Sequence, residues 1–191
     1  MPKVYTRKGD DGTTGLLYGG RVSKDDSGPA AYGAVDEAVS ALGLARAATE
    51  RGSELDTLLI RLERELFVVG AELATDPANR SKLEPEVSLV TAAMVEALEP
   101  VIDDITTRFD APTEFVLPGE NPVAAALDVA RTIVRRAERE SVQAARAGWL
   151  DDSFVVPYLN RLADLVYTLA RWQEGEARPV RIKQSSSGRN A

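Results

Sequence analysis

The chain of 191 residues contains no cysteine and no histidine. Without cysteine it can form neither a disulfide nor a catalytic thiolate, and without both residues the usual zinc sites are excluded. A histidine general base is excluded for the same reason. Any chemistry must therefore come from carboxylates, cations, hydroxyls, the backbone and bound cofactors.

The chain also lacks a long apolar run and a basic charge balance. No segment reaches the roughly 20 apolar residues of a membrane span, and the N-terminus does not resemble a signal peptide, so we expect a cytoplasmic protein with no membrane partner. Its 23 basic and 30 acidic residues give a net charge of −7. This argues against sequence-independent nucleic-acid binding, which needs a basic footprint. An anionic ligand stays compatible, because a basic pocket can lie on an acidic protein.

Apolar side chains recur with the 3.6-residue period of an α-helix from about residue 30 onward. Five such segments lie at about residues 35–45, 55–73, 87–101, 122–147 and 152–175, and Gly148 is a natural stop for the fourth. They predict an all-α fold, a five-helix up-and-down bundle over residues 30–175. Residues 1–29 are expected to form a loop-rich head, and residues 176–191 a polar, flexible tail. Helices of this length also favour association into an oligomer.

The head contains a segment, residues 6–15, that is rich in glycine, threonine and cations. Glycine allows backbone N–H groups to approach a phosphate, hydroxyls donate to its oxygens, and cations neutralise it. Lys24, which follows in residues 21–26, could supply another cation. The candidates for holding Mg²⁺ are Asp10, Asp11, Asp25 and Asp26. A solvated loop with two turns explains the same composition, and the Walker A pattern is absent. Composition alone leaves both interpretations open.

Residues 130–140 place four arginines and two glutamates on one predicted helix. Helical spacing puts Arg131 and Glu138 at the border of the apolar stripe, and Arg135 and Arg139 on a ridge beside them. A solvated face with i,i+4 ion pairs is one interpretation. Against it, a charge at the edge of a packed face needs a partner. An aspartate of another helix or subunit, such as Asp36, is a candidate.

The last predicted helix has a second face that is polar and aromatic. It is formed by Asn160, Asp164, Tyr167 and Arg171. Such a face suits either solvent or contact with a ligand or another subunit, and the sequence alone does not choose between them.

Several blocks, in a fixed order, resemble the PduO-type ATP:cob(I)alamin adenosyltransferases. They are YTRKGDDGTTG at residues 5–15, RVSKDD at 21–26, YGAVDE at 32–37 with SALG at 40–43, FVLPG at 115–119, ARTIVRRAER at 130–139 and YLNRLAD at 158–164. They span most of residues 5–172. One block alone could be coincidence, but the ordered set is highly specific to that family.

The resemblance implies a five-helix bundle that assembles as a homotrimer with an active site at each subunit interface. The nucleotide-binding residues that it implies are Thr6, Arg7, Lys8, Gly9, Thr14, Gly15 and Lys24 in the head, Arg135, Arg136, Glu138 and Arg139 in the arginine-rich helix, and Asn160. Arg131 and Asp36 match a salt bridge between neighbouring subunits. Phe115 matches an aromatic residue that packs beside the corrin and removes the lower axial ligand of cobalt.

The expected reaction transfers the 5′-deoxyadenosyl group of ATP to the cobalt of cob(I)alamin, with Mg²⁺ bound through the ATP phosphates. Cob(I)alamin is itself a strong nucleophile, which agrees with a chain that has neither histidine nor cysteine. Catalysis then consists of positioning and of stabilising the departing triphosphate. We expect Arg131, Asp36, Arg135, Glu138 and Phe115 to be catalytically important. A reductase and a B12-dependent enzyme are further possible partners.

Two departures from the family pattern stand out. Arg7 occupies a position where many members have lysine, and Asp128 one where many have histidine. Two alternative functions stay open from the sequence. One is a nucleotide-dependent module that delivers cobalamin without making the adenosyl form, and the other is a purely structural helical oligomer.

Overall fold

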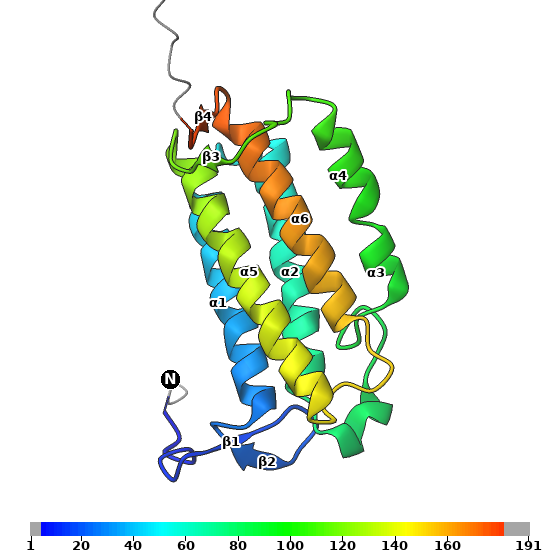
Figure 1. Cartoon of the computed structure of the whole chain (residues 1–191). Coiled ribbons are helices and arrows are strands. Elements are labelled where there is room, and N and C mark those ends of the chain that lie inside the picture. The colour runs from blue at the N-terminus through cyan, green and yellow to red at the C-terminus, as the bar shows by residue number, and fades with distance from the viewer. Residues whose placement is uncertain (1–4, 182–191) are drawn as a thin grey trace, which may run out of the picture.

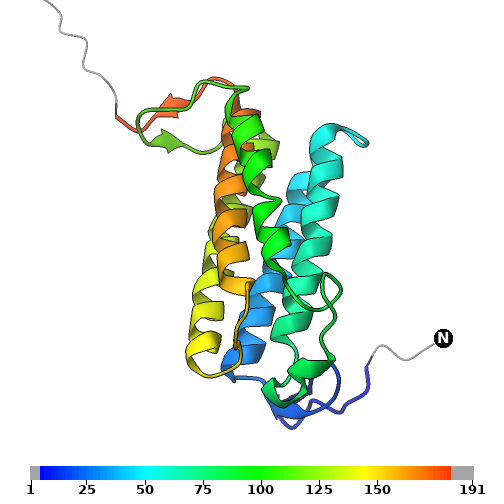
Figure 2. The same ribbon diagram turned by 90° about the vertical axis from the view of Figure 1, so that its right-hand side faces the viewer.

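Four long helices form an elongated bundle in the computed structural model, which describes residues 5–181 (Figure 1). They are α1 (Ser27–Ala47), α2 (Glu54–Leu73), α5 (Pro122–Arg146) and α6 (Val155–Glu174). Helix α1 lies between α2 and α5, and α5 also packs against α6. Two short helices, α3 (Ala92–Glu96) and α4 (Glu99–Thr106), lie against α6 (Figure 2). The predicted helical bundle is confirmed.

The ends of the long helices follow from local capping chemistry. Ser53 caps α2 by accepting a hydrogen bond from the backbone N–H of Asp56, and Asn121 caps α5 in the same way before Pro122. After α5, Gly148 has a φ of 84°, a backbone conformation that glycine adopts readily and other residues seldom do. The chain therefore leaves α5 where the sequence predicts.

The core is built from leucines and valines on α2 and α6 and from small side chains on α1. Helix α1 buries a row of alanines: Ala31, Ala34, Ala38, Ala41 and Ala45. Small side chains on this face allow the backbone of α5 to approach closely, and α5 contributes buried Ala130 and Ala137 to the same contact.

The third predicted helix is two short helices instead. Pro100 has no N–H and its ring clashes with the carbonyl four residues earlier, so a continuous helix cannot pass through it. It therefore stands in the first turn of a new helix, α4. Val87, assigned to the apolar stripe, is 64% exposed and precedes α3, which begins after the capping residue Thr91. The last long helix also starts later than expected, because Asp152 has a φ of 48°.

Two small antiparallel sheets lie at opposite ends of the bundle, where the sequence analysis expected loops (Figure 1). Strands β1 (Thr13–Gly15) and β2 (Arg21–Ser23) form a ribbon in the N-terminal head. Strands β3 (Val116–Leu117) and β4 (Arg178–Pro179) pair at the other end. The predicted tail from residue 176 thus includes strand β4, and residues 182–191 of that tail lie outside the described part of the chain.

The head is attached to the bundle through the loop that follows α2. The N–H of Leu17 donates to the carbonyl of Ala74, and the side chain of Asn79, in the 3₁₀-helix η1 (Pro77–Lys82), donates to the carbonyl of Gly19. Among the described residues, no helix is long and apolar enough to cross a membrane.

Candidate functional site

The predicted site residues occupy three levels along the bundle. The N-terminal loop lies beside β1 and β2 at one end, and Phe115 lies beside β3 at the other (Figure 1). Arg135 and Glu138 lie between these ends, near the middle of α5. A helix of 25 residues is about 37 Å long at 1.5 Å per residue. Within one chain, predicted site residues at the same level of the bundle lie close together, but the N-terminal head and Phe115 lie far apart.

The N-terminal loop is folded back on itself by its own cations. Lys24 donates from Nζ to the carbonyl of Gly9 at 2.7 Å, and Arg21 donates to the carbonyl of Lys8 and to the hydroxyl of Thr13. Asp11 accepts hydrogen bonds from the backbone and hydroxyl of Thr13, and these bonds lower the pKa of its carboxyl. The segment is thus an ordered turn and ribbon, and Thr6, Arg7 and Lys8 are exposed on it.

Gly9 fits closely into this arrangement. A Cβ at position 9 would lie 3.1 Å from the carbonyl oxygen of Thr13 and 3.2 Å from Nζ of Lys24. The close packing keeps the Lys24 ammonium directly beside the backbone of the loop. Thr14 and Gly15 continue from it into β1, opposite Val22 and Arg21 of β2.

The arginine ridge, which we define as Arg135 and Arg139, is exposed on α5. The two residues line a shallow hollow of about 300 Å³ together with Glu138, Val142, Gln143 and Arg146. Arg139 donates from Nη1 to the backbone carbonyl of Arg135 at 2.9 Å. The hollow carries three guanidinium groups and one carboxylate, a composition that favours an anionic ligand.

Asn160 of α6 reaches the same region. Its Nδ2 donates to Oε1 of Glu138 at 3.0 Å, so a residue of the second polar face is joined to the arginine-rich helix. Arg136 is held apart from the ridge, because its guanidinium forms an ion pair with Glu37 of α1. The structure thus joins Asn160 to Glu138 beside the ridge and places Arg136 toward α1.

Arg131 and Asp36 are not partners within one chain. Arg131 donates from Nε to Oδ1 of Asp128 on its own helix at 3.3 Å. Asp36 is exposed on α1 and lines a groove of about 480 Å³ between α1 and α2, whose walls are mainly apolar and include Phe67, which is 66% exposed.

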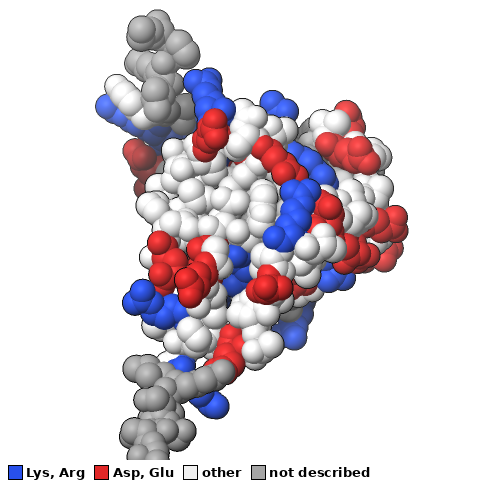
Figure 3. Space-filling model, turned by 90° about the horizontal axis from the view of Figure 1, so that it is seen from above, with Lys and Arg blue, Asp and Glu red and all other residues white. Residues whose placement is uncertain are grey.

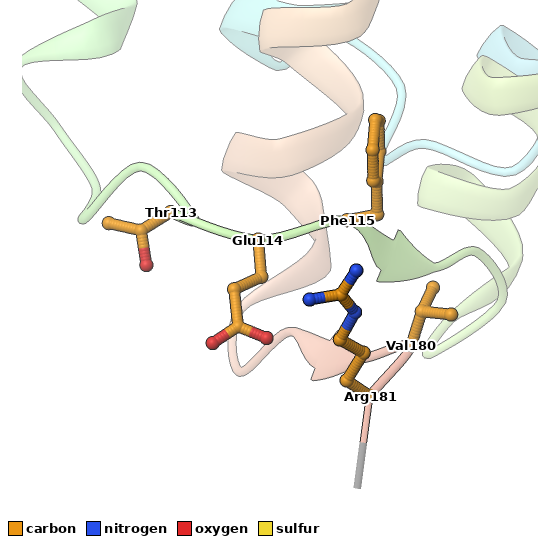
Figure 4. Close-up of a pocket in the computed structure, with 5 residues that line it drawn as sticks. All are labelled: Thr113, Glu114, Phe115, Val180 and Arg181. Carbon is orange, nitrogen blue, oxygen red and sulfur yellow. The ribbon is translucent and has the colours of Figure 1, made fainter. Parts of the chain in front are cut away.

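Phe115 is 90% exposed at the start of β3. Its carbonyl accepts a hydrogen bond of 2.8 Å from the N–H of Val180, directly after β4. Both residues line a hollow of about 260 Å³ with Thr113, Glu114 and Arg181 (Figure 4). This end of the bundle shows a broad area of uncharged side chains bordered by acidic and basic ones (Figure 3). The exposed ring of Phe115 next to Val180 is therefore a candidate for contact with a ligand or another chain.

The loop that carries Phe115 is anchored on two helices. Asn121 caps α5 and also donates from Nδ2 to the carbonyl of Gln173 in α6 at 2.6 Å. Arg178 of β4 pairs with Glu120 at 3.1 Å. Neither β4 nor Val180 was predicted as a neighbour of Phe115, because a two-residue strand leaves no periodic signal in the sequence.

The predicted polar face of α6 is divided in the structure. Asn160, Asp164 and Tyr167 are exposed, but Arg171 is buried against α5, where it binds Asp128. Arg171 was predicted to share one polar face with the other three residues, but it turns inward because its partner lies on another helix. In the part of the chain that the structure describes, no group of three or more acidic side chains is placed to hold a metal ion.

Comparison with known proteins agrees with this combination of helical bundle, cationic ridge and exposed aromatic. Residues 4–173 match the family model described as cobalamin adenosyltransferase. A corrinoid adenosyltransferase from Citrobacter freundii is 41% identical over 174 residues, which cover 91% of this chain and 96% of the relative. One from Mycobacterium tuberculosis is 40% identical over 173 residues, or 90% of this chain and 88% of the relative.

Solved structures give the same result. A variant of the PduO-type ATP:corrinoid adenosyltransferase from Lactobacillus reuteri, complexed with cobalamin and ATP, superimposes with a TM-score of 0.84 at 33% identity. The match covers 94% of this chain and all of that one. The fold and these matches together define a helical, ATP-dependent corrinoid enzyme. The chain belongs to the cobalamin adenosyltransferase family.

Proposed function

We infer that this protein transfers the 5′-deoxyadenosyl group of ATP to the cobalt of cob(I)alamin, forming adenosylcobalamin and triphosphate. The observation that carries this is the exposed arginine ridge, with Asn160 held on Glu138 beside it. This surface offers cations and an amide but no histidine or cysteine. The Lactobacillus reuteri relative was solved with both cobalamin and ATP, the two reactants of this transfer.

The reaction needs no nucleophile from the protein. A cobalt–carbon bond forms at C5′ of ATP as the bond from C5′ to the triphosphate oxygen breaks, and the electron pair of that bond leaves with the triphosphate. Cobalt supplies the attacking pair and is oxidised formally from the +1 to the +3 state. The protein must therefore align the two reactants in line and stabilise negative charge on the leaving group.

The cations of the head and of α5 are suited to stabilising the negative charge of the leaving triphosphate. Arg135 offers a planar fork of N–H donors for phosphate oxygens, and Lys8 and Lys24 offer compact ammonium charges. Mg²⁺ bound through the ATP phosphates would neutralise further charge, and it usually keeps several waters with only one or two protein carboxylates. Thr6, Arg7, Gly9, Thr14 and Gly15 complete the proposed nucleotide loop.

Phe115 is suited to binding cobalamin, the other reactant. Its exposed ring, together with Val180, offers apolar surface to the face of a corrin. Apolar surface cannot replace a nitrogen ligand, so packing there would leave the lower position of cobalt empty. Cobalt(II) without that ligand is easier to reduce to the reactive cobalt(I) state. We propose that Phe115 acts in this way.

We further propose a homotrimer with an active site at each subunit interface. Its support is that one chain separates Phe115 from the head, and that Asp36 lies exposed in a largely apolar groove. In the trimer, Asp36 of one subunit would pair with Arg131 of its neighbour. A reductase and a B12-dependent enzyme in the cytoplasm would supply the reduced cofactor and use the product.

The role of Arg135 is tested by Arg135→Ala. Removing a charged donor to the triphosphate should lower kcat with cob(I)alamin by about a hundredfold or more. Arg51→Ala is the matched control, because Arg51 is exposed in the turn between α1 and α2, at the opposite end from the head. Near-normal turnover of the Arg135 variant would refute its assigned role.

The substitution Phe115→Ala tests whether Phe115 acts in the reduction of cobalt(II) or in the transfer of the adenosyl group. The variant should lose most of its activity when the reaction starts from cobalt(II), because the lower ligand is no longer displaced. With chemically pre-reduced cobalt(I), it should retain most of its activity. An equal loss in both assays would contradict displacement of the ligand by Phe115.

A further inference from the structure

Asp128 lies on α5 where that helix packs against α6, and it is 7% exposed. Its two carboxylate oxygens are divided between two arginines. Oδ1 accepts a hydrogen bond from Nε of Arg131, at 3.3 Å, and Oδ2 accepts one from Nη2 of Arg171. The carboxylate therefore connects a buried arginine of α6 with the arginine at the border of the exposed face of α5.

The charges of the side chains around Asp128 balance one another. Arg171 is 4% exposed, and its Nη1 lies 3.1 Å from Oε2 of Glu174, which is itself 5% exposed. Asp128 and Glu174 carry two negative charges against the two positive charges of Arg131 and Arg171. Because an uncompensated charge in such a place is costly, the four side chains depend on one another for their positions.

The ring of Tyr167 limits Arg131 further. Its centroid lies 5.5 Å from Cζ of Arg171 and 6.0 Å from Cζ of Arg131, so both guanidinium groups contact the same aromatic side chain. With Nε on Asp128 and one face near Tyr167, the guanidinium of Arg131 keeps little rotational freedom. Within residues 5–181, its two terminal nitrogens make no hydrogen bond. They form a fork suited to a carboxylate outside this chain.

We propose that Asp128 is a positioning residue: it fixes Arg131 so that the terminal nitrogens are presented to a carboxylate of a neighbouring subunit. The proposal rests on the proposed adenosyl transfer at a subunit interface. Arg171 and Glu174 serve as the buried support that holds Asp128 in place. Asp128 itself touches no reactant, and its effect on turnover passes through Arg131.

A double-mutant cycle tests this coupling. We expect Asp128→Leu to lower kcat/KM about tenfold, Arg131→Gln to lower it at least as much, and the combined variant to lose no more than Arg131→Gln alone. Asp104→Leu is the control, because Asp104 forms an exposed i,i+4 pair with Arg108 and pairs with none of these four side chains. Losses that multiply in the combined variant would overturn the proposal.

A second comparison separates positioning from stability. The pair of changes Arg171→Met and Glu174→Gln removes the other buried charges, and Asp128→Leu is then added to it. If Asp128 acts through Arg131, the added change should still cost about tenfold in kcat/KM although it no longer leaves a buried arginine unpaired. Equal activity with and without the added change would show that Asp128 serves stability alone.

An NMR measurement makes the test independent of catalysis. The Nε–H of Arg131, assigned by its loss in Arg131→Lys, should exchange slowly with water in the wild-type protein and in Asp104→Leu, and quickly in Asp128→Leu. The same slow exchange in Asp128→Leu would overturn the proposal. A wild-type protein that forms no adenosylcobalamin would instead contradict the proposed function, and the exchange rates would still decide the role of Asp128.

Discussion

Replacing Gly28 by alanine tests how the start of α1 fits against the turn between α5 and α6. Gly28 is buried, and a Cβ at this position would lie 2.6 Å from two carbon atoms of the Trp149 ring and 2.7 Å from a third. Carbon atoms in contact prefer separations of about 3.5–4.0 Å. The ring would have to move by roughly 1 Å, and it is rigid and only 9% exposed.

The expected cost follows from these distances. Overpacking of a well-filled core typically costs about 1–3 kcal/mol. Alanine recovers at most about 1 kcal/mol through its higher helix propensity, and less in the first turn, where Gly28 lies. We therefore expect Gly28→Ala to lower the free energy of unfolding by about 1–2 kcal/mol. For a chain of this size that corresponds to a fall in Tm of about 2–8 °C.

Thermal and urea unfolding at one fixed protein concentration measure this effect. Gly43→Ala is the matched control on the same helix, because its Cβ would lie 3.6 Å from Oε1 of Glu63, an ordinary contact. It should leave stability unchanged or raise it by up to about 1 kcal/mol. Trp149→Phe should relieve part of the cost of Gly28→Ala in the double variant. A Gly28→Ala protein as stable as the wild type would refute the close contact with Trp149.

Further predictions concern the buried carboxylate of α6, a buried tyrosine and the head. Burial raises the pKa of Glu174 above its ordinary 4.5, so the group contributes stability below the unfolded pKa that is lost as pH rises through the folded pKa. The stability of Glu174→Gln relative to the wild type should therefore rise as pH increases from 4 to 7 in urea titrations, and a relative stability that stays level or falls over this range would contradict this. Tyr158 donates to Oε2 of Glu65 at 2.7 Å, and Tyr158→Phe should cost about 1–3 kcal/mol of unfolding free energy. Lys24→Gln should raise the KM for ATP about tenfold in steady-state assays, and an unchanged KM would argue against phosphate binding by the head.

Local chemistry made most of the long helices predictable. The apolar period of α2 and the Asn121, Pro122 and Gly148 signals around α5 act within one helix, so the sequence displays them directly. The start of α6 was misplaced because nothing in the composition reveals that Asp152 has a positive φ. The break at Pro100 was overlooked because the apolar stripe continues across it, although proline chemistry would have located it.

Individual residues of the site could be predicted from the sequence, but the contacts between them could not. The family blocks and helical spacing identified the exposed ridge, the head loop and Phe115. They did not reveal that Arg171 is buried, because its environment is decided by Asp128 on another helix, 43 positions away. Likewise, the pairing of β3 with β4 joins segments about 60 residues apart through backbone hydrogen bonds. Such long-range pairs depend on tertiary packing, which overrides local patterns.

Incubation of the protein with ATP, Mg²⁺ and chemically reduced cob(I)alamin under anaerobic conditions shows whether it forms the cobalt–carbon bond. The account predicts the absorption spectrum of an alkylcobalamin that disappears on exposure to light, together with one intact triphosphate for each cobalt–carbon bond formed. Binding of both reactants without this spectrum would contradict adenosyl transfer and favour a module that only delivers cobalamin. Absence of ATP binding would contradict the account as well and favour a structural role.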